Sequence, residues 1–190
     1  MRPRDNPFNA DRLDAVRYRP PQGTLDDILA RLEELACRAA VVGPDGSGKT
    51  TLLHDLRQAL ERRGRRTRLI FINDASLFPA AVCRRLLSEL TREEIVLLDG
   101  ADLIGRSSWR LFRRHTIRHA SGLIITAHRP GLFPTLIECA TTPALLREIA
   151  TELAPRSPLI TPALLDDLYP RHHANLRACL RALYDLHART

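Results

Sequence analysis

The stretch GPDGSGKT, residues 43–50, constrains the fold of this chain more than any other part of it. Three glycines fall within six positions and are followed by Lys49 and Thr50. A short apolar run, AAVVG at 39–43, leads into the stretch, and a segment with helical periodicity at about 50–63 leaves it. A short unbroken apolar run fits a strand that is covered on both faces, so this order is typical of a strand, a tight turn and a helix.

The same stretch fits the pattern GxxxxGK[ST], which binds phosphate groups. Glycines let successive backbone N–H groups point inward as an anion nest, and a helix that starts near Gly48 directs its positive end to the same place. Lys49 adds a flexible charge for the β- and γ-phosphates, and the Thr50 hydroxyl is a ligand for Mg²⁺. The predicted nucleotide-binding residues here are Gly43, Pro44, Asp45, Gly46, Ser47, Gly48, Lys49, Thr50 and Thr51.

Lys49 is the single lysine among the 29 lysines and arginines of the chain. At exposed positions, lysine and arginine replace each other at little cost in stability. A general bias toward arginine can therefore replace the lysines at those positions. A phosphate nest instead requires a compact charge on a thin side chain, which the planar fork of arginine does not provide. The retained lysine therefore supports the phosphate site.

Apolar runs and helical periods alternate along the chain as far as residue 142, and only helical segments follow. Strict alternation favours a parallel α/β sheet with helices on both faces. The sequence TPALL occurs at 142–146 and at 161–165, and each copy places threonine at an N-cap and proline at the first helical position. The predicted strands are 39–43, 67–74, 94–100, 122–130 and 135–142, and the predicted helices include 24–38, 50–63, 76–90, 104–119 and 174–188.

These elements predict an α/β fold, a parallel five-stranded P-loop NTPase sheet followed by a small C-terminal helical lid. We divide the chain into an N-terminal arm at 1–23, an α/β core at 24–142 and a lid subdomain at 143–190. The arm contains prolines and no sustained period, so we expect an extended segment or a lead-in loop.

Asp99 follows four apolar residues, Ile95–Leu98, and is predicted to end a strand. A carboxylate at this place holds Mg²⁺ directly or through water, so we expect Thr50 and Asp99 to be the metal ligands. The next residue is Gly100, where many ATPases that activate water have glutamate. Asp102 is then either the general base or the cap of the following helix, and the sequence does not decide between these roles.

Two later segments bring further polar side chains to the predicted phosphate site. TAHRP at 126–130 ends the fourth strand, and ligands bind at the carboxyl ends of parallel strands. We expect Thr126 or His128 to face the γ-phosphate, and Arg177 in the last helix to reach the nucleotide as the lid closes. Turn residues before a proline, and an arginine that faces solvent, are the alternatives. The predicted catalytic residues are Lys49, Asp99, Asp102 and His128.

The order of these motifs resembles that of the AAA+ ATPases, from about Asn6 to Leu186. GPDGSGKT resembles Walker A, and IVLLDGAD resembles Walker B without the glutamate of that family. TAHRP and ANLRACLRAL resemble the sensor 1 and sensor 2 segments, with His128 and Arg177 in the sensor positions. The resemblance implies ATP as the nucleotide, Mg²⁺ as its partner, and a lid that moves. The NPF lead-in is similar to that of helper ATPases of transposition and secretion.

One part of the AAA+ pattern is missing from the sequence. Only GLFP separates the sensor 1 segment from the fifth strand, where the family usually has a helix that ends in an arginine finger. We therefore carry over no arginine finger, and Arg113, Arg114 and Arg118 receive no role.

Composition adds expectations about partners and location. The net charge is +7 and the pI about 10.0, so DNA is a candidate partner, although a general bias toward arginine also accounts for this charge. No apolar run approaches the roughly 18 residues that cross a membrane, and no secretory signal is seen. The four cysteines lack metal spacing and are expected to be buried free thiols. We expect a cytoplasmic protein without a membrane partner.

Three functions remain open at this point. The first is an AAA+-like ATPase, or an ATP-operated switch, that hydrolyses ATP slowly and acts on a protein or DNA partner. The second is a small-molecule or nucleotide kinase, in which Asn73 and Asp74 bind an acceptor hydroxyl. The third is a nucleotide-binding module with little hydrolysis. Oligomerisation on nucleotide binding is also left open.

Overall fold

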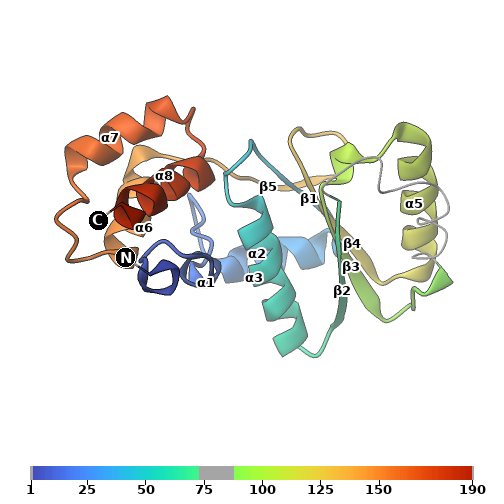
Figure 1. Ribbon diagram of the computed structural model, residues 1–190. Helices are drawn as coiled ribbons and strands as arrows, with labels where there is room; N and C mark the ends of the chain where they lie inside the picture. Colours follow the sequence, from blue (N-terminus) through green and yellow to red (C-terminus); the bar gives the residue numbers. More distant parts are fainter. Residues whose placement is uncertain (1, 73–87, 190) are drawn as a thin grey trace.

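In a computed structural model, the chain forms a parallel sheet of five strands (Figure 1). The structure describes residues 2–72 and 88–189. The order across the sheet is β2-β3-β4-β1-β5, and all four neighbouring pairs are parallel. The five-stranded parallel fold predicted from the sequence is thereby confirmed. The strands are β1 (Arg38–Val42), β2 (Arg66–Phe71), β3 (Glu94–Asp99), β4 (Gly122–Ala127) and β5 (Thr135–Glu138).

Helices cover both faces of the sheet because successive side chains of a strand point to opposite faces. Helices α2 (Leu25–Glu34) and α3 (Lys49–Arg62) lie on one face, and α5 (Arg106–His119) lies on the other (Figure 1). In β3, Ile95 and Leu97 belong to the core on the α2–α3 side, and Val96 and Leu98 to the core on the α5 side. All four are fully buried, which explains the unbroken apolar run in the sequence.

The helix boundaries differ from the predicted ones where the backbone turns. Helix α2 starts after Thr24, which forms a capping box with Asp27, but it ends at Glu34 instead of residue 38. Ala36 and Cys37 adopt left-handed φ angles of 50° and 54°, which direct the chain into β1. Helix α5 starts at Arg106 because a short 3-10 helix, η3 (Ala101–Leu103), comes first.

Three strand predictions were too long. Strand β4 ends at Ala127, β5 ends at Glu138, and residues 128–134 between them contain no helix. Strand β2 ends at Phe71, and Asn73, Asp74 and most of the predicted helix at 76–90 lie outside the described residues.

A group of three helices follows the sheet and lies to one side of it in Figure 1. It consists of α6 (Pro143–Leu153), α7 (Pro162–Arg171) and α8 (Leu176–Ala188). Thr142 and Thr161 cap α6 and α7 by accepting hydrogen bonds from the N–H groups of Leu145 and Leu164, at 3.0 and 3.2 Å. The two TPALL copies are therefore two separate helix starts, as the sequence indicated.

The N-terminal arm is not extended, which corrects our expectation for residues 6–23. It contains η1 (Pro3–Asp5) and the short helix α1 (Ala10–Ala15), because Asn9 caps the N–H group of Arg12 at 3.0 Å. Phe8 is only 1% exposed and packs into the core of α6, α7 and α8. The two ends of the chain accordingly lie in the same part of the molecule (Figure 1).

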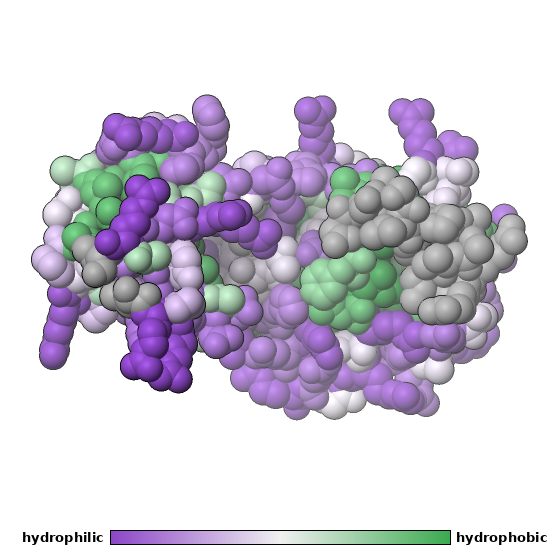
Figure 2. All heavy atoms as spheres, in the orientation of Figure 1, coloured by the Kyte–Doolittle hydropathy of each residue, from purple (hydrophilic) through white to green (hydrophobic). Residues whose placement is uncertain are grey.

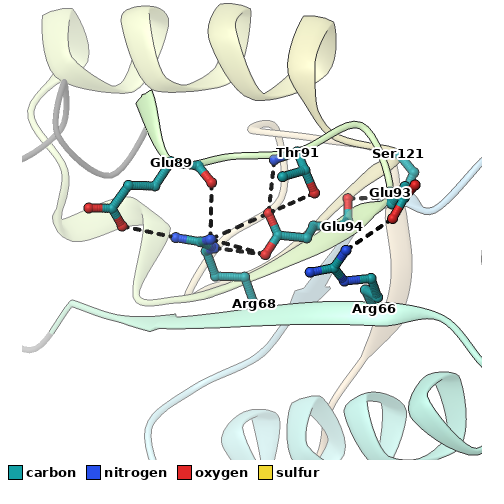
Figure 3. A network of polar contacts seen from close by, with 7 residues as sticks. All are labelled: Arg66, Arg68, Glu89, Thr91, Glu93, Glu94 and Ser121. Atoms are coloured by element: carbon teal, nitrogen blue, oxygen red, sulfur yellow. Dashed lines mark hydrogen bonds and ion pairs between the residues drawn. The ribbon is translucent and has the colours of Figure 1, made fainter.

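The amino end of β3 is held to its neighbour by charged side chains (Figure 3). Arg68 of β2 donates to Glu94 at 3.1 Å, and Thr91 donates its N–H to the same carboxylate at 2.9 Å. Arg66 donates to Glu93 at 3.0 Å. Glu94 therefore lies at the opposite end of β3 from Asp99.

Hydrophilic side chains cover most of the face shown in Figure 2, and apolar atoms are also visible in the group of three helices. No helix in the described ranges is both long and apolar enough to cross a membrane. Cys37, Cys139 and Cys179 are buried free thiols, whereas Cys83 lies outside the described residues.

Candidate nucleotide-binding site

The strand order places the predicted site residues at one edge of the sheet. Strand β4 pairs with both β1 and β3, so the carboxyl ends of these three strands lie next to one another. The loop after β1, Asp99 at the end of β3 and His128 just after β4 are thereby brought together. Ligands of open parallel sheets bind at this edge.

The glycine-rich loop joins β1 to α3, and Lys49 begins that helix. The Lys49 ammonium donates to the carbonyl oxygens of Gly43 at 2.7 Å and Pro44 at 2.8 Å. Partial burial lowers the pKa of Lys49, and nearby carboxylates, Asp45 foremost, oppose this shift. The loop thus holds a partly desolvated cation, which strengthens its interaction with an anion.

Asp99 is oriented by two threonines. Its carboxylate accepts a hydrogen bond from the Thr50 hydroxyl at 2.8 Å and another from the Thr126 hydroxyl. The Thr126 oxygen in turn accepts from the Gly100 N–H at 2.8 Å. A hydroxyl and a carboxylate held side by side are hard oxygen ligands of the kind that Mg²⁺ prefers.

His128 joins two carboxylates across the site. Its Nδ1 lies 2.5 Å from Asp102, its backbone N–H donates to the same carboxylate at 3.0 Å, and its Nε2 lies 2.8 Å from Asp45 of the loop. Hydrogen bonds to Asp45 and Asp102 raise the pKa of His128, and the hydrogen bond from His128 lowers the pKa of Asp45. Burial raises the pKa of Asp102, but its bonds to His128 outweigh burial and the net shift is downward. Asp45, His128 and Asp102 are therefore joined by successive hydrogen bonds from the loop to the turn after β3.

The structure shows what the Asp102 carboxylate contacts. Asp102 lies within η3, whereas the N-cap of α5 is Gly105, which makes no side-chain cap. The Asp102 carboxylate is instead engaged by His128. Asp102 is therefore a partner of His128 at the site and does not cap α5.

Gly100 shows why no glutamate follows Asp99. Its φ angle is 85°, and a Cβ atom built on it would lie 2.3 Å from the carbonyl oxygen of Ile72. Residues with a side chain rarely adopt this backbone conformation, and the contact is with backbone that cannot turn aside. The glutamate position of the family pattern is thus closed in this chain by its backbone.

The start of α8 rests on the glycine-rich loop. A Cβ atom built on Gly46 would lie 1.9 Å from Oδ1 of Asn175 and 3.2 Å from the backbone nitrogen of Arg177. Asn175 also caps α8, because its side chain accepts from the N–H of Ala178 at 3.0 Å. The helical group therefore contacts the loop through the segment that carries Arg177, and both the Arg177 backbone and the His128 ring lie next to the loop.

These groups line one cavity of about 770 Å³, a volume suited to a nucleotide. Its polar lining comes from the loop and from Asp99, Asp102, Thr126, His128 and Arg177. Apolar side chains of the arm and of the helical group also line it, and these are Leu13, Val16, Tyr18, Leu145, Ile149, Leu176 and Leu180.

Sequence reasoning missed the apolar residues of the arm and of the helical group that line this cavity. One signal was available, since Asp55 lies on the buried side of α3 and a buried carboxylate requires partners. Asp55 accepts from the backbone N–H of Tyr18 and from the Arg17 side chain, each at 2.7 Å. These bonds fix the arm beside the loop.

Comparison with known proteins supports this picture of the fold. The family model of the AAA domain matches residues 38–126. The RuvB Holliday junction branch migration motor of Thermotoga maritima superposes with a TM-score of 0.61 at 18% identity, over 83% of this chain and 58% of that chain. PCH-2 of C. elegans superposes with a TM-score of 0.51 at 13% identity, over 85% of this chain and 66% of that chain. No curated protein matches the chain.

The chain therefore spans less than two thirds of the length of RuvB. A sequence identity of 18% supports similarity in fold alone. The narrower similarity to helper ATPases of transposition and secretion stays a prediction. The chain is therefore similar to the AAA domain over residues 38–126, and its fold is the α/β P-loop NTPase-like fold that it shares with RuvB.

Proposed function

We propose that the chain binds Mg-ATP in this cavity and hydrolyses it slowly, as a switch that acts on a protein or DNA partner. The observation that carries the proposal is the hydrogen bond of 2.8 Å between the Thr50 hydroxyl and Asp99, at the mouth of a glycine-rich loop that holds Lys49. ATP rather than GTP follows from the AAA+ resemblance.

The residues present fit both ATP and Mg²⁺. Backbone N–H groups from Gly46 to Thr50 would receive the phosphates, and Lys49 would exchange its bonds to loop carbonyls for bonds to phosphate oxygens. Thr50 and Asp99 would hold the metal, which would neutralise charge on the phosphates when bound. Tyr18 and the other apolar lining residues would receive the base.

Slow hydrolysis is supported by the surroundings of Asp99. Gly100 provides no carboxylate, and Asp102 is already bonded to both the backbone and the ring of His128. In our proposal, Asp102 and His128 act as a pair, with Asp102 orienting the ring and His128 contacting the γ-phosphate or the attacking water. To accept a proton from the attacking water, the Asp102 carboxylate would first have to give up a hydrogen bond to His128. Turnover would therefore be slow.

The switch is proposed to be the lid formed by residues 143–190, together with the arm. Arg177 would bind the phosphates, and its segment already contacts Gly46. The arm packs on the same helices through Phe8, so both would move together as ATP binds and leaves.

A test is the affinity for a fluorescent ATP analogue, together with phosphate release, in the wild type and in Lys49→Ala. Loss of Lys49 should weaken binding at least about tenfold, because one charge-assisted bond to phosphate contributes on the order of 1.5–3 kcal/mol. Arg62→Ala, which removes one exposed charge from the far end of α3, is the matched control and should bind as the wild type does. Equal affinities in Lys49→Ala and the wild type would contradict the proposal.

The same surroundings of Asp99 also favour a second candidate, a nucleotide-binding module without hydrolysis. It predicts tight binding with no phosphate release above the background of Lys49→Ala. Phosphate release that depends on Lys49 would exclude it.

A further inference from the structure

Helix α5 carries a row of arginines along one side. Arg106, Arg110, Arg114 and Arg118 follow one another at four-residue intervals, and all four are exposed. Residues four apart are neighbours on a helix surface, so successive arginines of the row lie about 6 Å apart along the axis. We call these four residues the arginine row.

Among the residues that the structure describes, no carboxylate pairs with the arginine row. Helix α5 contains no acidic residue, and within residues 2–72 and 88–189 none of the four arginines has an ion-pair or hydrogen-bond partner. Arg113, the remaining arginine of α5, lies over the ring of Phe133 at 5.1 Å and is outside the row.

Several arginines on other elements pair with carboxylates. Arg66 and Arg68 of β2 pair with Glu93 and Glu94 (Figure 3), and Arg63 pairs with Glu33 at 2.8 Å. A general bias toward arginine does not explain four exposed arginines at regular four-residue intervals on one helix that contains no acidic residue. The row is therefore a local feature that needs a separate explanation.

The exposed side of α5 is better suited to a nucleic acid than to a protein. Protein interfaces usually have an apolar, aromatic-rich centre, whereas nucleic-acid interfaces are polar and strongly positive. The aromatic side chains of α5, Trp109 and Phe112, are buried against the sheet, and Leu111 at 41% exposed is the only large apolar side chain that α5 exposes. Regularly spaced cations without partners match a regularly charged polyanion.

We propose that the arginine row binds the phosphate backbone of a nucleic acid. This inference names the partner on which the proposed ATP-operated switch acts. Binding of the nucleic acid itself does not depend on the proposed function, whereas its biological role rests on that function. Arginine to phosphate is a charge-assisted and often bidentate contact, so four such contacts along about 18 Å suffice for salt-dependent binding that is independent of base sequence.

The arginine row also reaches the nucleotide site. Arg106 lines a hollow of about 340 Å³ together with Trp109 and Arg129, and Asp102 and His128 line the same hollow. A backbone bound at the amino end of the row would lie beside the pair that faces the nucleotide. His128 would thereby lie next to both the bound nucleic acid and the bound nucleotide.

Fluorescence anisotropy with a labelled 25-base-pair duplex, without nucleotide and over a range of salt concentrations, tests the proposal. The row variant is Arg110→Gln/Arg114→Gln/Arg118→Gln. The matched control, Arg63→Gln/Arg66→Gln/Arg171→Gln, removes the same charge from arginines that pair with carboxylates. The row variant should bind about 10- to 100-fold more weakly at 0.1 M salt, with a salt slope lower by about 3, and the control should stay within about twofold.

The outcomes separate clearly. Equal losses in both variants, or no binding of the wild type at 50 mM salt, would overturn the proposal. Tighter binding to a polyglutamate peptide than to duplex or single-stranded DNA would overturn the nucleic-acid assignment. Each single substitution should lower the salt slope by about 1, which keeps the test valid if the triple variant does not fold.

The same samples separate this inference from the proposed function. Lys49→Ala should keep its affinity for DNA, and the row variant should keep its affinity for the ATP analogue. If ATP does not bind the wild type while the row binds DNA, the proposed function fails and the nucleic-acid surface remains.

Discussion

Several residues of the site are defined as much by what their backbone allows as by their side chains. Gly100 and Gly46 each lie against atoms that a Cβ would meet, the Ile72 carbonyl in one case and Asn175 in the other. The sequence pattern indicated where phosphate would bind, since glycine spacing and Lys49 are local signals. It did not indicate that Asp45, His128 and Asp102 lie in contact, because they come from three separate segments that only the folded sheet brings together.

The clash at Gly100 predicts a large loss of stability in Gly100→Ala. We expect about 2–4 kcal/mol, from the left-handed φ together with overpacking against the Ile72 carbonyl. Gly64→Ala is the matched control, because Gly64 has a φ of 75° and no atom within 4 Å of an added Cβ. The control should lose about 1 kcal/mol by urea denaturation. Equal losses in the two variants would contradict the clash.

The bonds of His128 predict a pH-dependent difference in stability between the wild type and His128→Gln. A raised histidine pKa means that folding favours the protonated ring, so this contribution is present below about pH 6.5 and is lost as the pH rises through the folded pKa. The lowered pKa values of Asp45 and Asp102 limit the contribution at the acid end, where it is lost as these carboxylates become protonated. Urea denaturation should show the largest difference between about pH 4 and 6.5. Parallel curves across that range would contradict the role of His128.

At the scale of elements, the sheet and its covering helices were the most predictable part. Strand β3 is apolar on both faces, and the capping box at Thr24 marks the start of α2, so each carried its own signal. The arm was not predictable because a single apolar residue such as Phe8, among polar residues, has no period. Its burial depends on α8, more than 160 residues later in the chain.

Phe8→Ala should loosen the helical group more than the sheet. Removal of a buried phenylalanine destabilises by about 3–5 kcal/mol, and Phe8 belongs to the core of α6, α7 and α8. Hydrogen exchange should accelerate in these helices, with smaller changes in β3 and β4. Phe71→Ala is the control, because Phe71 is 53% exposed and its removal should change stability by about 0.5 kcal/mol. Uniform acceleration across the chain would contradict a separate helical group.

At the scale of the whole molecule, strand order was the piece that the sequence did not contain. Hydrophobic runs identify strands but not their neighbours, so the position of β1 between β4 and β5 came from the structure. That order decides which strand ends meet, and therefore which polar residues share the cavity. The alternation of strands and helices did predict the parallel sheet, because a parallel connection needs a helix to cross over.

A ligand that binds between the loop, the arm and the helical group should stabilise the molecule as a whole. At an ATP concentration about 100-fold above Kd, we expect about 2.7 kcal/mol, which corresponds to roughly 5–10 °C in Tm. Lys49→Ala should show a much smaller shift at the same ATP concentration. A wild type whose Tm does not respond to Mg-ATP would contradict binding in this cavity.

The contact between Phe8 and the last helices also has a consequence for the order of folding. The ring of Phe8 lies 5.2 Å from that of His187, and Asn6 donates to the carbonyl of Tyr184 at 2.9 Å. During synthesis the arm precedes its partners in α8 by more than 160 residues, so Phe8 stays exposed to water while the sheet is completed. Contacts so distant in sequence form slowly, and we expect the packing of Phe8 to be a late step of folding.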